Sequence, residues 1–306
     1  MDKILRIYIK TMSLDHKLAT DDIHNILEKY DFSKLNHFID YIGKHNPYNK
    51  NIDKISYLMW QEQAIINFPL QYLYSIYIYL YSLEKNCKTF IFATRDCCHL
   101  YKIFKKLFPE SDSHYFHCSR NMFQTATDKK NKHFYDYCKS IVKDPQKTIF
   151  IDLHGTGRRF ATYFHKDFKY VPEFIILSSR FKNKEHLNNE FNHIPETLNY
   201  DCLIYKSAGS PIEMLNYDLV GTLQNYTKDG PLRDKLEYDK ELVIPYHKCI
   251  EFITHHLNPA NPKTITKHTK SDLHNIIKHI YKYILTDLPI ITEKIKHLSR
   301  HTKPTF

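Results

Sequence analysis

The residues best suited to chemistry lie in one short segment, IFIDLHGTGRRF, at positions 149–160. Its apolar start ends in a carboxylate, Asp152, and the chain then enters a turn that holds two of its six glycines, Gly155 and Gly157. Glycine permits positive φ and lets the backbone approach a ligand closely. A helix that begins after such a turn presents unpaired N–H groups to an anion, and Thr156 adds a hydroxyl. The segment therefore predicts an anion-binding loop.

The side chains around this loop suit a phosphorylated ligand. Arg158 and Arg159 follow the last glycine, and the planar guanidinium fork matches phosphate oxygens. A carboxylate at the position of Asp152 is within reach of ribose hydroxyls or of a hydrated Mg²⁺. We therefore expect Mg²⁺ as a cofactor, held through water at Asp152 and not by a ligand set of the protein alone. The competing interpretation is an ordinary tight turn with exposed arginines.

The same segment resembles the PRPP loop of type I phosphoribosyltransferases, in which an apolar run leads into two acids, three variable residues and Thr-Gly. Asp152 matches the second acid, Thr156 and Gly157 match the Thr-Gly, and Ile151 replaces the first acid. The resemblance implies that the loop at 155–158 holds a 5′-phosphate and that Asp152 faces the ribose. On this basis, Gly157→Val is expected to abolish ligand binding and to leave the fold largely intact.

An earlier strand-to-helix turn supplies the second part of the expected site. The phosphoribosyltransferase resemblance implies a pyrophosphate-binding loop at FIFATRDC, residues 90–97, where Arg95 approaches the pyrophosphate. The chain is also similar to uncharacterised domains associated with haloacid-dehalogenase-type proteins of polysaccharide clusters. Those domains have strands that end in Arg-Asp, in Ser-Arg, and in Asp followed by a glycine loop. This likeness groups Arg95, Asp96 and Arg120 with Asp152 in one site.

Three other functions remain open at this point. The stretch from Asp152 to Arg158 is similar to motif I of SAM-dependent methyltransferases, although it lacks the first glycine of that motif. A haloacid-dehalogenase-related phosphotransfer enzyme is a second alternative, but we find no Asp-x-Asp nucleophile motif after the first strand. The third is a non-enzymatic basic module that binds nucleic acid through its C-terminal region.

Smaller candidates are Cys97, Cys98 and His99, together with Glu213 and Asn216. Adjacent residues on a helix point about 100° apart, so the Cys-Cys-His run is not expected to form a catalytic dyad, although a cysteine at a helix N-terminus can be activated. Glu213 and Asn216 are spaced to project into a shared cleft. Seven cysteines without a CxxC pair argue against a disulfide framework or a thiolate zinc site.

The elements that must position these residues follow an alternating pattern. Short apolar runs at 88–94, 114–118, 147–152 and 174–177 are separated by segments with helical spacing. This order predicts an α/β fold, with a parallel sheet of about four to six strands covered by helices. Ligands of such sheets bind beyond the carboxyl ends of the strands, where the candidate residues fall.

Three zones are expected along the chain: a helical N-terminal layer at 1–85, an α/β phosphate-binding core at 86–245, and a basic helical region at 246–306. The net charge of +10 favours anionic partners. From residue 263 onward, nine Lys or Arg stand against three Asp or Glu, so a nucleic acid is a candidate partner there.

A membrane partner is not expected. Residues 63–83 carry no charge but include several polar side chains, which predicts a buried helix, kinked near Pro69, and not a bilayer span. The first residues lack the basic and apolar regions of a secretory signal, so a cytoplasmic location is expected.

Overall fold

The expected α/β fold is confirmed in the computed structural model, which describes residues 18–194, 198–207, 209–236, 238–286 and 290–291. Five parallel strands form one sheet in the order β2-β1-β3-β4-β5. The strands of this sheet are β1 (Thr89–Ala93), β2 (Asp112–Phe116), β3 (Thr148–His154), β4 (Glu173–Ser178) and β5 (Tyr200–Ile204).

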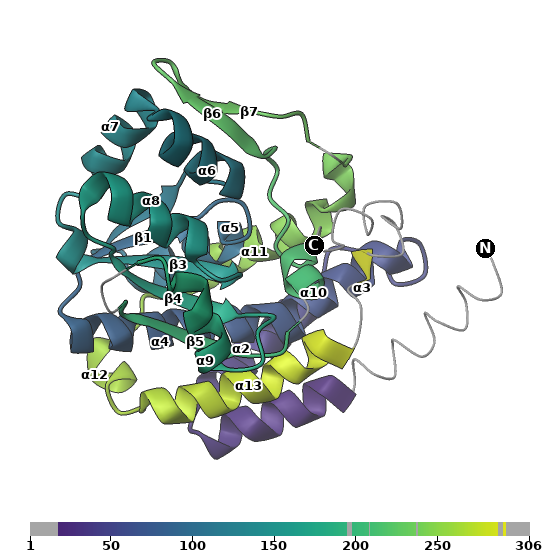
Figure 1. Cartoon of the computed structure of the whole chain (residues 1–306). Coiled ribbons are helices and arrows are strands. Elements are labelled where there is room, and N and C mark those ends of the chain that lie inside the picture. The colour runs from purple at the N-terminus through teal and green to yellow at the C-terminus, as the bar shows by residue number, and fades with distance from the viewer. Residues whose placement is uncertain (1–17, 195–197, 208, 237, 287–289, 292–306) are drawn as a thin grey trace.

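Helices cover both faces of the sheet (Figure 1). The first face carries α4 (Phe68–Lys85), α5 (Cys98–Leu107), α11 (Ile244–His256) and α13 (Lys270–Thr286). The second face carries α6 (Arg120–Lys129), α7 (Lys132–Ile141), α8 (Arg158–Phe168) and the short α9 (Lys184–Asn188). The chain changes faces between β1 and β3, since α5 follows β1 on one side and α8 follows β3 on the other. This change marks a topological switch point, where doubly wound sheets bind their ligands.

The remaining elements connect these layers. They are a helix over residues 18–29, α2 (Ser33–Lys44), the 3₁₀ turns η2 (Pro145–Lys147), η3 (Asn189–Phe191) and η4 (Lys240–Leu242), α10 (Gly209–Met214), the antiparallel hairpin β6 (Leu223–Thr227) and β7 (Gly230–Arg233), and α12 (Pro262–Ile265). The hairpin projects beyond α6 at the top of Figure 1.

The long N-terminal helix contains an irregular turn next to its proline. It begins as α3 (Lys54–Glu62), passes through the π-helical turn η1 (Gln63–Asn67) and continues as α4. Pro69 has no N–H to donate to the preceding turn, which explains why the regular hydrogen-bond ladder is interrupted there. Among the described helices, none combines the length and the apolar character needed to cross a bilayer.

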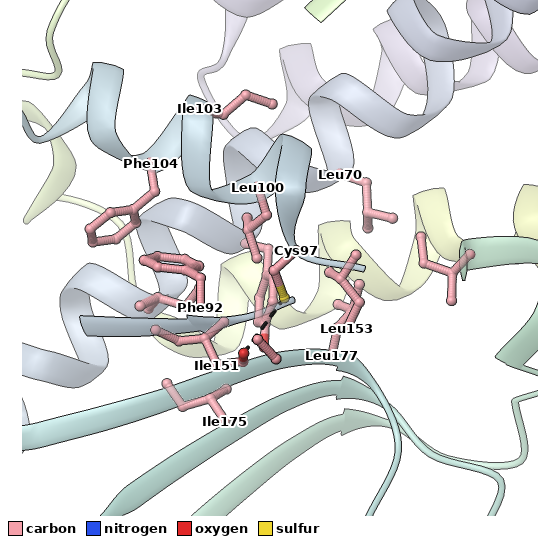
Figure 2. Close-up of a cluster of buried hydrophobic side chains, with 14 of the residues drawn as sticks. Leu70, Phe92, Cys97, Leu100, Ile103, Phe104, Ile151, Leu153, Ile175 and Leu177 are labelled. Atoms are coloured by element: carbon pink, nitrogen blue, oxygen red, sulfur yellow. Dashed lines mark hydrogen bonds between the residues drawn. The ribbon is translucent and has the colours of Figure 1, made fainter. Parts of the chain in front are cut away.

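The core of the molecule lies between the sheet and the helices. Figure 2 shows Leu70 of α4 and Leu100 of α5 meeting Ile151, Leu153 and other side chains of the central strands. Each of these four side chains is fully buried. Because side chains alternate along a strand, Asp152, between Ile151 and Leu153, points to the opposite face. The sheet therefore fixes the direction of this carboxylate.

Three tyrosines bind α4 to the strands beneath it. The hydroxyl of Tyr74 donates to the backbone oxygen of Asp152 at 3.2 Å, and that of Tyr77 donates to Asp201 of β5. The hydroxyl of Tyr81 donates to the carboxylate of Glu173 in β4 at 2.7 Å. The spacing of three and four residues puts all three rings on one face of the helix. The same three side chains therefore bury their aromatic rings in the core and donate hydrogen bonds to polar groups of the strands.

Tyr81→Phe is expected to lower the free energy of unfolding by about 1–3 kcal/mol, because it leaves the buried carboxylate of Glu173 without its donor. Chemical denaturation measures this difference. Tyr79→Phe, on the same helix but at a partly exposed ring stacked on Phe108, is the control and should change stability much less. Equal effects of the two substitutions would show that the Glu173 contact contributes nothing specific.

The described part of the C-terminal region packs onto the N-terminal helix. Asp22 accepts hydrogen bonds from His279, Lys282 and Tyr283 of α13. Lys270, at the start of α13, forms an ion pair with Glu84 at 2.5 Å. Basic residues of α13 are therefore used in contacts within the protein. Lys263, Lys267 and Lys278 are exposed, and the basic residues of the tail at positions 292–306 lie outside the described residues, as does the N-terminal segment 1–17.

Candidate functional site

Three carboxylates meet at the carboxyl end of the sheet. Asp96 follows β1, Asp152 lies near the end of β3, and Glu213 lies on α10, and each is partly buried. The charge of Asp96 raises the pKa of both Asp152 and Glu213, and the charge of Asp152 raises that of Glu213. The group spans the β1/β3 switch point. The structure thus brings together two residues expected from the sequence and a third, Glu213, that was only a minor candidate.

Burial raises the pKa of all three carboxyl groups. Desolvation by burial raises the pKa of Asp152 to about 7, and the charge of Asp96 adds to this increase. Burial also raises the pKa of Glu213 to about 8, with further contributions from Asp96 and Asp152. The pKa of Asp96 is raised for the same main reason. Crowded carboxylates with raised pKa values are typical of sites that bind a cation or transfer a proton.

Two arginines lie beside the carboxylates. The charge of Arg120 lowers the pKa of Asp96, Asp152 and Glu213, against the effect of burial, and the charge of Arg95 does so for Asp96 and Glu213. Arg120 is the first residue of α6, whose N-cap, Ser119, accepts from the backbone at 3.0 Å. The site therefore combines acidic side chains with two guanidinium groups.

The ends of β1 and β2 are joined by Thr94. Its hydroxyl contacts the backbone oxygens of Phe116 at 3.1 Å and Cys118 at 3.0 Å, and accepts from the N–H of Cys118 at 3.0 Å. The peptide bond between Thr94 and Arg95 is cis. These bonds hold the segment that carries Arg95 next to the one that carries Arg120.

The glycine loop after β3 has the backbone that its sequence predicts. Gly155 has φ 155° and Gly157, the N-cap of α8, has φ 70°. A Cβ on Gly155 would lie 3.4 Å from an oxygen of Asp152, so this loop folds closely over the carboxylate. The hydroxyl of Thr156 accepts from the N–H of Arg158 at 3.2 Å. The loop at 155–157 therefore joins the end of β3, which carries Asp152, to the first turn of α8.

Gly157 has a second role that was not expected from the sequence. A Cβ at this position would lie 2.7 Å from the ring of Phe174 in β4, which is fully buried. Gly157→Val would therefore disturb the packing of α8 on the sheet as well as the loop. The expectation that this substitution leaves the fold intact is wrong for that reason, and other positions must be used to test the site.

Arg158 and Arg159, the two arginines that follow the glycine loop, have different surroundings from Arg95 and Arg120. Arg158 forms an ion pair with Glu190 at 3.5 Å, on the side of η3. Arg159 is exposed on the first turn of α8. The side chain of Arg158 is thus held toward a carboxylate outside the group at the switch point.

Cys97 does not have the properties of an activated nucleophile. Its side chain is fully buried in the cluster of Figure 2, where its thiol contacts the backbone oxygen of Ile151 at 3.5 Å. Burial raises the pKa of this thiol well above its ordinary value. All seven cysteines are free and buried, which agrees with the absence of a disulfide framework expected from the sequence.

Glu213 and Asn216 do not share a cleft, although their spacing suggested it. The side chain of Asn216 is fully buried and forms an amide network with Asn67 and Gln71 of the long N-terminal helix. Glu213 instead lies close enough to Asp96 and Asp152 for their charges to raise its pKa. The only local signal for its role is an acidic residue in a short helix after β5.

A scan against models of known protein families found no match, and a search of curated proteins also found none.

Proposed function

We propose that this protein binds the magnesium complex of a phosphorylated ribose or nucleotide, in the manner of a phosphoribosyltransferase-like domain. One observation carries the proposal. Asp96, Asp152 and Glu213 converge with Arg95 and Arg120 beside the glycine loop, at the switch point of a doubly wound sheet.

Each part of the site has a distinct role in this proposal. The loop at 155–157 and the N-terminus of α8 bind the terminal phosphate of the ribose through backbone N–H groups. Asp152 faces the ribose hydroxyls, and Arg95 and Arg120 bind the pyrophosphate or second phosphate group. Ile151 is buried in the core, so no second acid adjoins Asp152 in the strand.

The carboxylates also fit Mg²⁺ chemically. This ion prefers oxygen ligands and usually keeps several waters while one or two carboxylates and substrate phosphates bind it. Asp152, Asp96 and Glu213 are the residues that would hold it, directly or through water. The ion would neutralise phosphate charge. In a transferase, the contribution of the protein's own residues would be to position the ligand and stabilise charge.

The methyltransferase alternative has less support. Its next strand should end in an acid that binds the ribose of SAM, but β4 ends at Ser178. The hydroxyl of Ser178 donates to Leu153 O at 3.0 Å and accepts from the hydroxyl of Tyr281 at 2.8 Å. A serine used in this way does not replace a ribose-binding carboxylate.

A thermal-shift comparison tests the proposed ligand class. At a hundredfold excess over Kd, a ligand contributes about 2.7 kcal/mol, which for a chain of this length corresponds to a rise in Tm of roughly 4 °C. We expect phosphoribosyl pyrophosphate (PRPP) or a nucleotide to produce this rise with Mg²⁺ and a much smaller one with EDTA. Stabilisation by SAM, or by none of the phosphorylated compounds, would contradict the proposal.

A further inference from the structure

A cluster of one cysteine and two histidines lies between α5 and α11. Cys98 and His99 are the first residues of α5, and His247 lies in the first turn of α11. One ligand atom from each of the three side chains lies within 4.8 Å of the others. The side chains are 4%, 0% and 3% exposed, respectively. The cluster is therefore enclosed by protein, and its polar atoms must find partners there.

Two of those polar atoms have none among the described residues. His99 Nε2 and His247 Nδ1 are buried without a hydrogen-bond partner. A buried polar group in this state costs about 1–3 kcal/mol, and such groups are uncommon in folded proteins. The two rings pack edge to face with their centroids 4.6 Å apart. The unpartnered Nδ1 of His247 indicates that a binding partner is missing from the cluster, whereas at His99 the nitrogen that contacts Cys98 is Nδ1 and not the unpartnered Nε2.

The surroundings of His247 fit a metal ligand. Its Nε2 lies 2.8 Å from the backbone oxygen of Tyr217 and must donate to it, which leaves the lone pair on Nδ1 free to bind a cation. Metal-binding histidines usually donate their second ring N–H to a carbonyl or carboxylate in this way. The charges of Asp218 and Glu251 favour a cation at His247, and that of Lys102 opposes it.

The distances around Cys98 fit a tetrahedral site. Its Sγ lies 3.5 Å from His99 Nδ1 and 3.3 Å from the backbone oxygen of Asn216. A zinc ion with bonds of about 2.3 Å to sulfur and about 2.0–2.1 Å to nitrogen or oxygen separates these atoms by about 3.6 Å. Because the three ligand atoms lie within 4.8 Å of one another, bringing them to such separations requires movements of at most about 1.5 Å.

We propose that Cys98, His99 and His247 bind one Zn²⁺, with a fourth position beside the backbone oxygen of Asn216. A thiolate and two imidazoles suit Zn²⁺, whereas Mg²⁺ prefers oxygen ligands, so this site is chemically distinct from the carboxylate group. The ion would connect the start of α5 to α11. Because Cys98 lies two residues after Asp96, it would also fix the segment that carries Arg95 and Asp96. The inference stands whether or not the proposed ligand is correct.

Metal content and cobalt spectroscopy test this site in the full-length protein. We expect metal-free wild type, kept reduced, to take up one equivalent of Zn²⁺ in competition with a chromophoric chelator, with a rise in Tm. Co²⁺ in place of Zn²⁺ should give a thiolate-to-cobalt charge-transfer band and the strong visible absorption of tetrahedral coordination. Cys98→Ser should remove that band and weaken Zn²⁺ binding at least 100-fold.

Cys97→Ser is the matched control, because Cys97 is the adjacent buried cysteine and its thiol contacts Ile151 instead. It should keep the cobalt band and the zinc affinity. His247→Gln should weaken zinc binding as well, with circular dichroism verifying the fold. If Cys98→Ser does not fold, the cobalt spectrum of the wild type tests whether a thiolate binds the metal. Wild type that takes up no stoichiometric Zn²⁺, a cobalt spectrum without a thiolate band, or unchanged binding in Cys98→Ser would overturn the proposal.

Discussion

Arg120→Ala is expected to weaken binding of PRPP in the presence of Mg²⁺ by about 10- to 100-fold. A hydrogen bond between a charged donor and phosphate contributes about 1.5–3 kcal/mol, and Arg120 is the arginine whose charge reaches all three carboxylates of the site. The side chain is exposed at the start of α6, so its removal should leave the fold intact. Isothermal titration calorimetry measures the change in Kd.

Lys166→Ala is the control for a general effect of charge. Lys166 lies in the last turn of α8, at the end opposite to the glycine loop, and its substitution removes the same single positive charge. It should leave Kd nearly unchanged. If both substitutions weaken binding equally, the ligand responds to the net charge of the protein and not to a site at the switch point.

The second large effect concerns pH. Mg²⁺-dependent binding should strengthen about tenfold between roughly pH 6 and pH 9, because the carboxyl of Asp152, with its pKa raised to about 7, changes from mostly protonated to ionised over this range. Glu213, with a pKa of about 8, adds to the same trend. Binding titrations at fixed Mg²⁺ measure the profile, and Asp152→Asn should flatten it.

As the pH rises over the same range, the stability of the ligand-free protein should fall. These pKa values are raised on folding, so the folded state binds more protons than the unfolded state between about pH 4 and pH 8. The contribution of Asp152 and Glu213 to stability is therefore lost as the pH rises through their folded pKa values. Asp152→Asn should make the ligand-free protein more stable at pH 8, relative to wild type. A Tm for this variant below that of wild type at pH 8 would contradict this account of the site.

Most of the sheet could be predicted because β1, β3 and β4 contain apolar runs between charged or turn-forming residues. The expected runs at 88–94 and 147–152 correspond to β1 and β3. β5 was missed because its sequence, YDCLI, is only partly apolar. Its Asp201 is tolerated in the strand because Tyr77 of α4 donates a hydrogen bond to it. That contact joins segments far apart in the chain, which local patterns do not reveal.

Contacts between distant segments also explain why some residues around the site could not be predicted from the sequence. The helix α6 is largely polar, and its buried residues are only Met122, Phe123 and Ala126, so its sequence has little helical apolar spacing. Asp152 and the glycine loop could be found because their chemistry lies in consecutive residues. Glu213 could not be assigned in this way, because only folding brings α10 to the ends of β1 and β3. The same holds for His247 and Cys98, which meet across two helices.

The most direct test of the central claim is a calorimetric titration at pH 8 with PRPP, with Mg²⁺ and with EDTA, on wild type and on Asp152→Asn. The site described here predicts saturable binding of one ligand per chain to wild type, weakened at least tenfold by EDTA, and little effect of EDTA on the variant. The absence of binding to wild type, or an equal dependence on Mg²⁺ in both proteins, would contradict the assignment of Asp152 to a metal–phosphate site.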